Sequence, residues 1–143
     1  MGVGIVDYSL YVRKPGPDSV KSTAFPTLGA LLRRKAPHMT TQQLAVTGVS
    51  TQANVYFDGK CVSHSVTLAD GSKKSVGVVL PSQLTFKTGA PEVMECVAGG
   101  CEYKLAGSEQ WNKSGPGDKF NVPGNSSFDI RVAEAYHYIC HFG

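Results

Sequence analysis

The stretch SQLTFKTGAPEVMECVA, residues 82–98, decides the fold class of this chain. Its first half alternates the apolar Leu84 and Phe86 with polar side chains, which is the period-two pattern of a β-strand with one buried face. A Gly-Ala-Pro turn at 89–91 follows, and residues 92–98 then resume a strand-like, largely apolar run. A strand, a tight turn and a second strand predict an antiparallel hairpin.

Short strand-like runs separated by turn residues continue on both sides of this hairpin. Asp-Gly and Pro-Gly turn signals at 58–59, 70–71 and 123–124 separate further runs that are predicted to be strands, namely 54–57, 60–68, 74–80, 101–105, 119–122, 128–132 and 136–142. No helix longer than two turns is expected after Asn54. This pattern predicts an all-β sandwich or barrel and argues against a parallel α/β sheet.

Composition narrows the class further. The chain has 143 residues, of which 41% are hydrophobic and 17% charged, as expected of one globular domain with a real core. No apolar run is long enough to span a membrane and no secretory signal is recognised, so we expect a cytoplasmic protein without a membrane partner. The four cysteines follow no zinc or disulfide spacing and are expected to be free, buried thiols.

The net charge of +3 belongs to the front of the chain. Residues 1–38 carry six basic and two acidic groups, whereas residues 39–143 carry eight basic and nine acidic groups. Because a nucleic-acid-binding domain usually concentrates Lys and Arg on its folded surface, we expect no nucleic-acid partner.

The first 50 residues differ in texture from the rest. They are rich in proline and contain one short predicted helix at 27–35, which is too short to be stable alone. We assign residues 1–50 as an irregular N-terminal extension and 51–143 as the barrel domain. The extension could be natural and docked, disordered, the result of a misplaced start, or vector-derived.

Two segments resemble the paired motifs of the cupin superfamily. Residues 92–99 resemble the first motif, with its glutamate and closing glycine, and residues 117–124 resemble the second, with its Gly-Asp and Pro-containing turn. The resemblance implies a jelly-roll-like (RmlC-type) barrel. Metal-binding cupins have histidines where this chain has Phe86, Thr88 and Phe128, so no metal is expected. His64, His137 and His141 do not restore a ligand set.

A series of shorter motifs in register covers roughly residues 54–143. They are Tyr56-Phe-Asp-Gly-Lys60, Ser75-Val-Gly-Val78, Pro91-Glu-Val-Met94, Phe120-Asn-Val-Pro-Gly124, Ser127-Phe128 and Val132-Ala133 with Tyr138-Ile-Cys140. This series resembles the pyrimidine/purine nucleoside phosphorylases, small bacterial cupins. The resemblance implies a homodimer that cleaves nucleosides with phosphate as co-substrate, releasing a free base and a pentose 1-phosphate, without metal or other cofactor.

Such a reaction needs an anion site that holds phosphate near C1′ of the pentose, contacts to the ribose hydroxyls, and a wall and a hydrogen bond for the leaving base. Glu92 is the predicted catalytic residue. The predicted substrate-binding residues are Phe57, Ser75, Phe86, Thr88, Tyr136 and Tyr138, and the predicted phosphate-binding residues are Lys60 and Ser127. For each of these residues a purely structural role was the competing interpretation, such as a rim carboxylate, a hairpin lysine or a core aromatic.

Two other functions remain open from sequence. One is a metal-dependent cupin oxygenase or isomerase, and the other is a non-catalytic cupin that binds a sugar or nucleotide. Metal content separates the first from our prediction, and phosphate-dependent release of base separates the second.

Overall fold

The computed structural model describes residues 42–143. This part of the chain contains eleven β-strands and a single 3-10 turn, η2 (Phe57–Gly59). The strands are β1 (Gly48–Val49), β2 (Asn54–Tyr56), β3 (Cys61–Thr67), β4 (Lys73–Val79), β5 (Ser82–Lys87), β6 (Glu92–Ala98), β7 (Cys101–Leu105), β8 (Asn112–Ser114), β9 (Lys119–Val122), β10 (Ser127–Val132) and β11 (Tyr136–Phe142). No helix within residues 42–143 is long and apolar enough to cross a bilayer.

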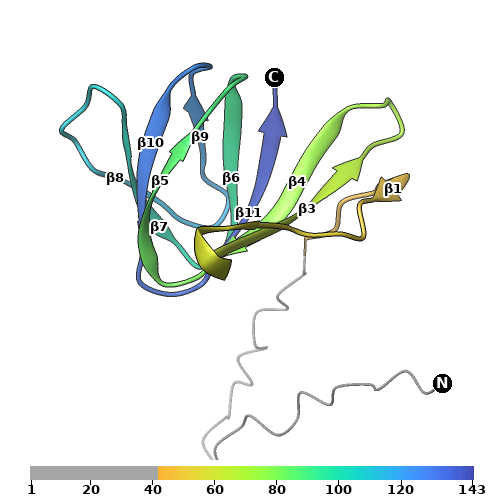
Figure 1. The fold of residues 1–143 in the computed structure, drawn as a ribbon, viewed down its shortest axis with the longest axis horizontal. Helices are drawn as coiled ribbons and strands as arrows, with labels where there is room; N and C mark the ends of the chain where they lie inside the picture. Colours follow the sequence, from red (N-terminus) through yellow and green to blue (C-terminus); the bar gives the residue numbers. More distant parts are fainter. Residues whose placement is uncertain (1–41) are drawn as a thin grey trace, which may run out of the picture. The chain divides into compact units, whose positions relative to one another are not determined.

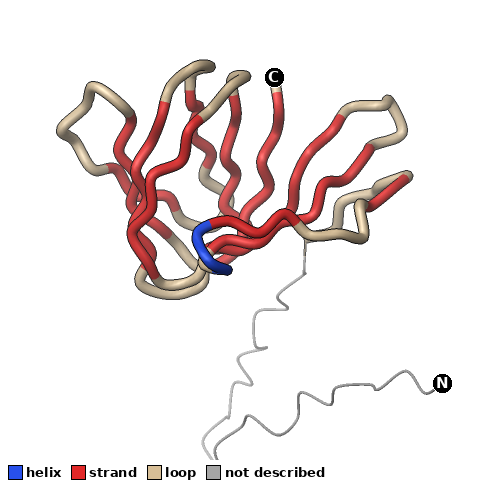
Figure 2. Tube along the Cα trace, viewed as in Figure 1, coloured by secondary structure: helices blue, strands red, loops and turns tan. Residues whose placement is uncertain are grey.

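The strands form two antiparallel sheets that face each other (Figure 1). The larger sheet has the order β1-β3-β4-β11-β6-β9, with β2 also paired to β3, and the smaller has the order β5-β10-β7-β8. Figure 2 shows that strand makes up most of the described chain and that the loops between strands are short. The predicted all-β class is therefore confirmed, and the arrangement is consistent with a cupin-like barrel.

Alternation in the sequence explains how the sheets face each other. In β10, Phe128, Ile130 and Val132 are buried whereas Arg131 between them is exposed. In β9, Phe120 and Val122 are buried in the same way. Because successive side chains of a strand point to opposite faces, each sheet contributes one apolar face to a shared core.

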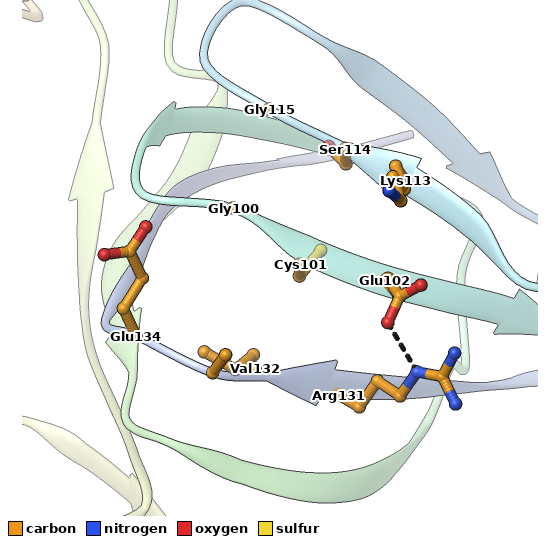
Figure 3. Close-up of a pocket in the computed structure, with 10 residues that line it drawn as sticks. Gly100, Cys101, Glu102, Lys113, Ser114, Gly115, Arg131, Val132 and Glu134 are labelled. Carbon is orange, nitrogen blue, oxygen red and sulfur yellow. Dashed lines mark hydrogen bonds and ion pairs between the residues drawn. The ribbon is translucent and has the colours of Figure 1, made fainter.

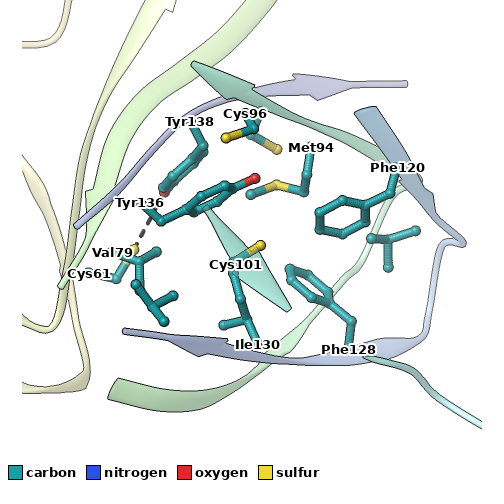
Figure 4. Packing of buried hydrophobic residues seen from close by; sticks show 13 residues of the cluster. Cys61, Val79, Met94, Cys96, Cys101, Phe120, Phe128, Ile130, Tyr136 and Tyr138 are labelled. Carbon is teal, nitrogen blue, oxygen red and sulfur yellow. Dashed lines mark hydrogen bonds between the residues drawn. The ribbon is translucent and has the colours of Figure 1, made fainter. Parts of the chain in front are cut away.

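The core is rich in aromatic rings and thiols (Figure 4). Phe120 of the larger sheet stacks on Tyr103 of the smaller sheet, with ring centroids 3.8 Å apart and planes inclined by 7°. Phe120 also meets Phe128 edge-on at 5.7 Å, and Phe128 stacks on Phe86 at 5.3 Å. All four cysteines are free and buried, as predicted.

The outward face of the smaller sheet is polar. Arg131 Nε donates to Glu102 Oε2 at 2.6 Å, and Lys104 Nζ lies 3.5 Å from Asp129 Oδ2. The guanidinium of Arg131 also lies over the Trp111 ring, 4.1 Å from its centroid. These charged groups are paired across neighbouring strands, so this face needs no covering element.

The structure agrees closely with the strands predicted from 54 onward, and it adds two short ones. β8 (Asn112–Ser114) has no apolar alternation, and β1 (Gly48–Val49) is only two residues long. Because β1 pairs with β3, sheet structure begins a few residues before the 51 that we assigned to the domain start. The predicted helix at 27–35 and most of the predicted extension lie outside the described residues.

Gly77 in β4 is required by close packing. A Cβ at this position would lie 2.7 Å from the Val62 carbonyl oxygen, 2.7 Å from Ser63 Cβ and 2.8 Å from the Tyr138 hydroxyl. All three distances are shorter than real Cβ contacts, and one of the atoms belongs to the backbone. The glycine therefore marks a close approach between β4, the backbone of β3 and the Tyr138 side chain.

We expect Gly77→Ala to lower the free energy of unfolding by about 1–3 kcal/mol, because an added methyl group must push β3 and the Tyr138 ring away. Gly48→Ala is the matched control, since a Cβ there meets nothing within 4 Å. Chemical denaturation of the three proteins measures the difference. Equal stability of Gly77→Ala and the parent protein would contradict this packing.

Candidate active site

A pocket of about 130 Å³ opens between the two sheets. The larger sheet contributes most of its lining, including Glu92, Ser75, Tyr138 and Cys140, and β5 of the smaller sheet contributes Phe86. Four of the residues predicted from sequence therefore meet in one place: Glu92, Ser75, Phe86 and Tyr138. An acid, hydroxyl groups and an aromatic ring in one cavity are suited to a polar organic ligand.

Glu92 is the first residue of β6 and shares the inward face of that strand with Met94 and Cys96. Its neighbours across the sheet are Phe142 on β11 and Val122 on β9. Burial raises the pKa of Glu92 above its ordinary value, and a hydrogen bond from the Cys140 thiol partly opposes this rise. A carboxylate that is partly desolvated in this way exerts a stronger field on nearby charge than one in water.

Cys140 is a donor to this carboxylate rather than a nucleophile. Burial, together with the neighbouring Glu92 charge, raises the pKa of Cys140 to about 12. The thiol is therefore protonated near neutral pH, and a thiol is poorly nucleophilic in that form. Ser75, directly opposite Cys140 across the β4–β11 pair, is also buried, and its hydroxyl is hydrogen-bonded with Cys140 in the lining of the same pocket.

Tyr138 forms the inner wall. Its hydroxyl lies 3.4 Å from the Cys61 sulfur, in the space that Gly77 leaves open. Burial raises the pKa of Tyr138 well above its ordinary value, and the contact with Cys61 is the next largest cause of this rise. The phenol is therefore neutral near neutral pH, and its hydroxyl can donate or accept a hydrogen bond.

An aromatic wall closes the side nearest the smaller sheet. Phe86 stacks on Phe128 behind it, and Phe57 meets Phe86 edge-on with centroids 5.1 Å apart. Phe57 holds a left-handed backbone conformation, with φ of 51°, which is uncommon for an aromatic residue. Its ring thus contacts the pocket wall from the η2 turn.

The other predicted site residues lie elsewhere. Thr88 Oγ1 donates to the Pro123 carbonyl at 2.6 Å and accepts from the Ser126 amide at 3.1 Å, which ties β5 to the β9–β10 loop. Tyr136 is fully buried in the core. Lys60 is exposed after the η2 turn, and its amide bonds to the Phe57 carbonyl. Ser127 lines a separate small hollow with Lys104 and Asp129.

Lys87, Tyr56, Phe142 and Cys140 line the pocket but were not predicted as site residues. Alternation along β5 puts Lys87 on the polar side of that strand, so only its position at the rim brings it to the pocket. Tyr56 and Phe142 are the last residues of β2 and β11, and the sequence did not show which strands pair with these two. The only signal in the sequence was an aromatic residue next to a predicted turn or to the end of the chain.

The residues at the positions of cupin metal ligands do not form a ligand set. Phe86 and Phe128 stack on each other there, and Thr88 is bonded to main chain. Within residues 42–143 no group of three or more His, Cys, Asp or Glu side chains is placed to hold a metal ion.

A polar cluster centred on Glu95 lies on the outward face of the larger sheet. Glu95 Oε2 accepts from His141 Nε2 at 2.6 Å and lies 3.2 Å from Lys119 Nζ, while Oε1 accepts from Gln42 Nε2 at 3.2 Å. Burial alone would raise the pKa of Glu95, but these donors lower it overall. His141 also meets Lys74. The cluster ties β4, β11, β6 and β9 together and does not reach the pocket.

A larger hollow of about 580 Å³ lies along β7, β8 and β10 (Figure 3). Glu102 and Arg131 form an ion pair within it, with Lys113 on the next strand. None of the predicted site residues lines this hollow, and two of its charged side chains, Arg131 and Glu102, are already paired with each other. It is therefore a weaker candidate than the pocket around Glu92.

Fold and pocket together define a cupin-like barrel protein with a candidate small-molecule pocket between its sheets. The family model described as pyrimidine/purine nucleoside phosphorylase matches residues 51–142. The chain belongs to this family, which confirms the family and the enzyme class predicted from its motifs.

Relatives of the same name support the assignment. A pyrimidine/purine nucleoside phosphorylase of Albidiferax ferrireducens is 74% identical over 105 residues, covering 73% of this chain and 100% of the relative. One of Paracidovorax citrulli is 70% identical with the same coverage. Among solved structures, a protein of unknown function from Acinetobacter sp. ADP1 has a TM-score of 0.69 and 44% identity, covering 71% of this chain and 98% of that one.

Proposed function

We propose that this chain cleaves purine and pyrimidine nucleosides with inorganic phosphate, giving the free base and an α-D-pentose 1-phosphate. The observation that carries the proposal is the partly buried Glu92, which faces an aromatic-walled pocket in a member of this family. We further propose that the reaction needs no metal or cofactor beyond phosphate as co-substrate. Stoichiometric iron, manganese or zinc in the active protein would contradict that part.

The chemistry follows from the charges. A phosphate oxygen attacks C1′ as the C1′–N bond breaks, and the electrons of that bond leave with the base, which takes up the proton that hydrogen phosphate loses. The pentose passes through an oxocarbenium-like state, whose positive charge the Glu92 carboxylate stabilises. We assign the ribose hydroxyls to Ser75 and Tyr138, because both residues line the same pocket as Glu92.

The phosphate needs a cation beside this pocket. Lys87 is the one Lys or Arg that lines it among the described residues, and its strand partner across β10 is Ser127. We assign the phosphate to Lys87, in place of Lys60, which does not line the pocket, with Ser127 as a neighbouring hydroxyl. Phe57 supports the base side through Phe86, and Thr88 and Tyr136 contribute through the shape of the barrel.

A homodimer is also part of the proposal. A groove of about 420 Å³ on the outward face of the larger sheet is lined by Val62, Val76, Val78 and Val97, with His64 and His137 beside them. The smaller sheet carries the Arg131–Glu102 and Lys104–Asp129 ion pairs on its outward face, so the apolar valine face is the better surface for a second copy. A cytoplasmic location is proposed because the four free thiols suit a reducing compartment.

Phosphate dependence tests the activity. Inosine and uridine are incubated with the protein, with and without phosphate, and free base is measured by chromatography. We expect base and pentose 1-phosphate to appear only with phosphate. Release of base at the same rate without phosphate, or no release at all, would overturn the proposed function.

We expect Glu92→Gln to lower kcat by about 100-fold or more while the fold is retained, because the amide cannot supply negative charge. Since the pKa of Glu92 is raised, kcat/KM of the parent protein should fall on acidification at a pH above the ordinary 4.5, as the carboxylate protonates. This acidic limb should disappear in Glu92→Gln. Circular dichroism checks the fold, and near-normal turnover would remove Glu92 from the mechanism.

The dimer proposal predicts a molar mass near twice the 15.2 kDa of the chain. Val62→Glu should shift light-scattering mass toward the monomer, because it buries a charge in the valine face. Gln83→Glu, on the outward face of the smaller sheet, is the matched control and should stay dimeric. A monomeric parent protein, or dissociation by both variants, would refute this surface.

A further inference from the structure

Two half-exposed aromatic residues line the pocket. Tyr56 and Phe142 each have 46% of their surface exposed, and both belong to the lining that contains Glu92. Large aromatic side chains that stay exposed to solvent beside a cavity are typical of ligand-binding surfaces.

Their backbones hold them at the mouth. Tyr56 shares the inward face of β2 with Asn54, whose amide bonds to Ser63 and Ser65. Directly after β2 the chain turns through three residues with positive φ, Phe57 at 51°, Asp58 at 53° and Gly59 at 88°. This turn ends β2 at Tyr56. Phe142 lies directly opposite Glu92 in the β11–β6 pair, so its ring is next to the acid.

The other rings at the pocket are already engaged. Phe86 meets Phe57 at its edge and Phe128 at its face, and the Tyr138 hydroxyl contacts Cys61. Within residues 42–143 no ring–ring contact involves Tyr56 or Phe142. These two side chains therefore offer free aromatic faces at the mouth.

The pocket volume requires the ligand to extend to that mouth. About 130 Å³ is well below the roughly 300 Å³ at which pockets begin to enclose a drug-sized ligand. The polar groups, Glu92 and Ser75, belong to the larger sheet inside the pocket. A nucleoside whose pentose lies against these groups must hold its base outside them, beside Tyr56 and Phe142.

We propose that Tyr56 and Phe142 bind the base by stacking and so determine which ligands the pocket accepts. This inference rests on the proposed phosphorolysis. Stacking uses the faces of the base rather than its hydrogen-bonding edges, so one pair of rings accepts purines and pyrimidines alike. Discrimination then falls on the ring system: an aromatic base is bound, and a saturated or aliphatic aglycone is not.

The reverse reaction tests this assignment, because base and pentose 1-phosphate have separate KM values there. We expect Tyr56→Leu and Phe142→Leu to raise KM for hypoxanthine and uracil about fivefold or more. KM for ribose 1-phosphate should stay within twofold. Tyr56→Phe and Phe142→Tyr keep the ring and should keep the parent KM for base.

Leu80→Ala is the matched control, since Leu80 is 40% exposed but does not line the pocket. It should leave both KM values unchanged. If the leucine variants keep the parent KM for base, or raise both KM values equally, stacking by these rings is refuted. Thermal unfolding of each variant separates loss of folding from loss of binding.

Failure of the proposed function is recognised separately. A parent protein without phosphorolysis contradicts that function, and calorimetric titration with inosine then tests the rings directly. Binding that Tyr56→Leu and Phe142→Leu weaken, and that Leu80→Ala preserves, supports the inference without turnover. Equal binding by all variants, or no binding by the parent protein, overturns it.

Discussion

The contact on which the rest of the structure depends is the stack of Phe120 on Tyr103. Phe120 belongs to the larger sheet and Tyr103 to the smaller, so their 3.8 Å centroid separation joins the two layers. Phe128 and Phe86 continue this aromatic packing across the smaller sheet. Burial of several large rings in one place provides much of the apolar area that a domain of this size needs.

The same packing determines where a ligand can bind. Rings fill one part of the space between the sheets, and the pocket occupies the part lined by Ser75, Tyr138 and Glu92. Glu92, the first residue of β6, points into this space. Its burial costs solvation, which is the reason for its raised pKa and for its stronger field toward a developing positive charge.

The two carboxylates of β6, Glu92 and Glu95, lie on opposite faces of the strand and have different roles for that reason. Glu92 points inward and has one thiol donor, whereas Glu95 points outward and has three donors from His141, Lys119 and Gln42. Their pKa values move in opposite directions for that reason. The satisfied acid stabilises the sheet, and the partly unsatisfied one is available for chemistry.

Sequence alone determined the strands and the family, because both depend on local order. Alternation along 82–88, 128–132 and 119–122 specifies which side chains face inward, and turn residues specify where each strand ends. The family motifs and the chemistry of the reaction pointed to Glu92, Ser75, Phe86 and Tyr138 among the candidates, and these four line one pocket. β8 escaped prediction because it lacks a buried alternating face and is held by its pairing with β7.

Only the tertiary structure decided which distant residues share a site. Lys60 and Ser127 fit a phosphate role by residue type, but the fold places Lys87 at the pocket, since β5 ends beside β6 and β11. Thr88 lies next to it in sequence, yet its hydroxyl is engaged by the β9–β10 loop. Tyr56 and Phe142 are 86 positions apart and meet at one pocket because β2 and β11 belong to the same curved sheet. Such proximity follows from how strands pair across the sheet, and the spacing of residues along the chain does not encode it.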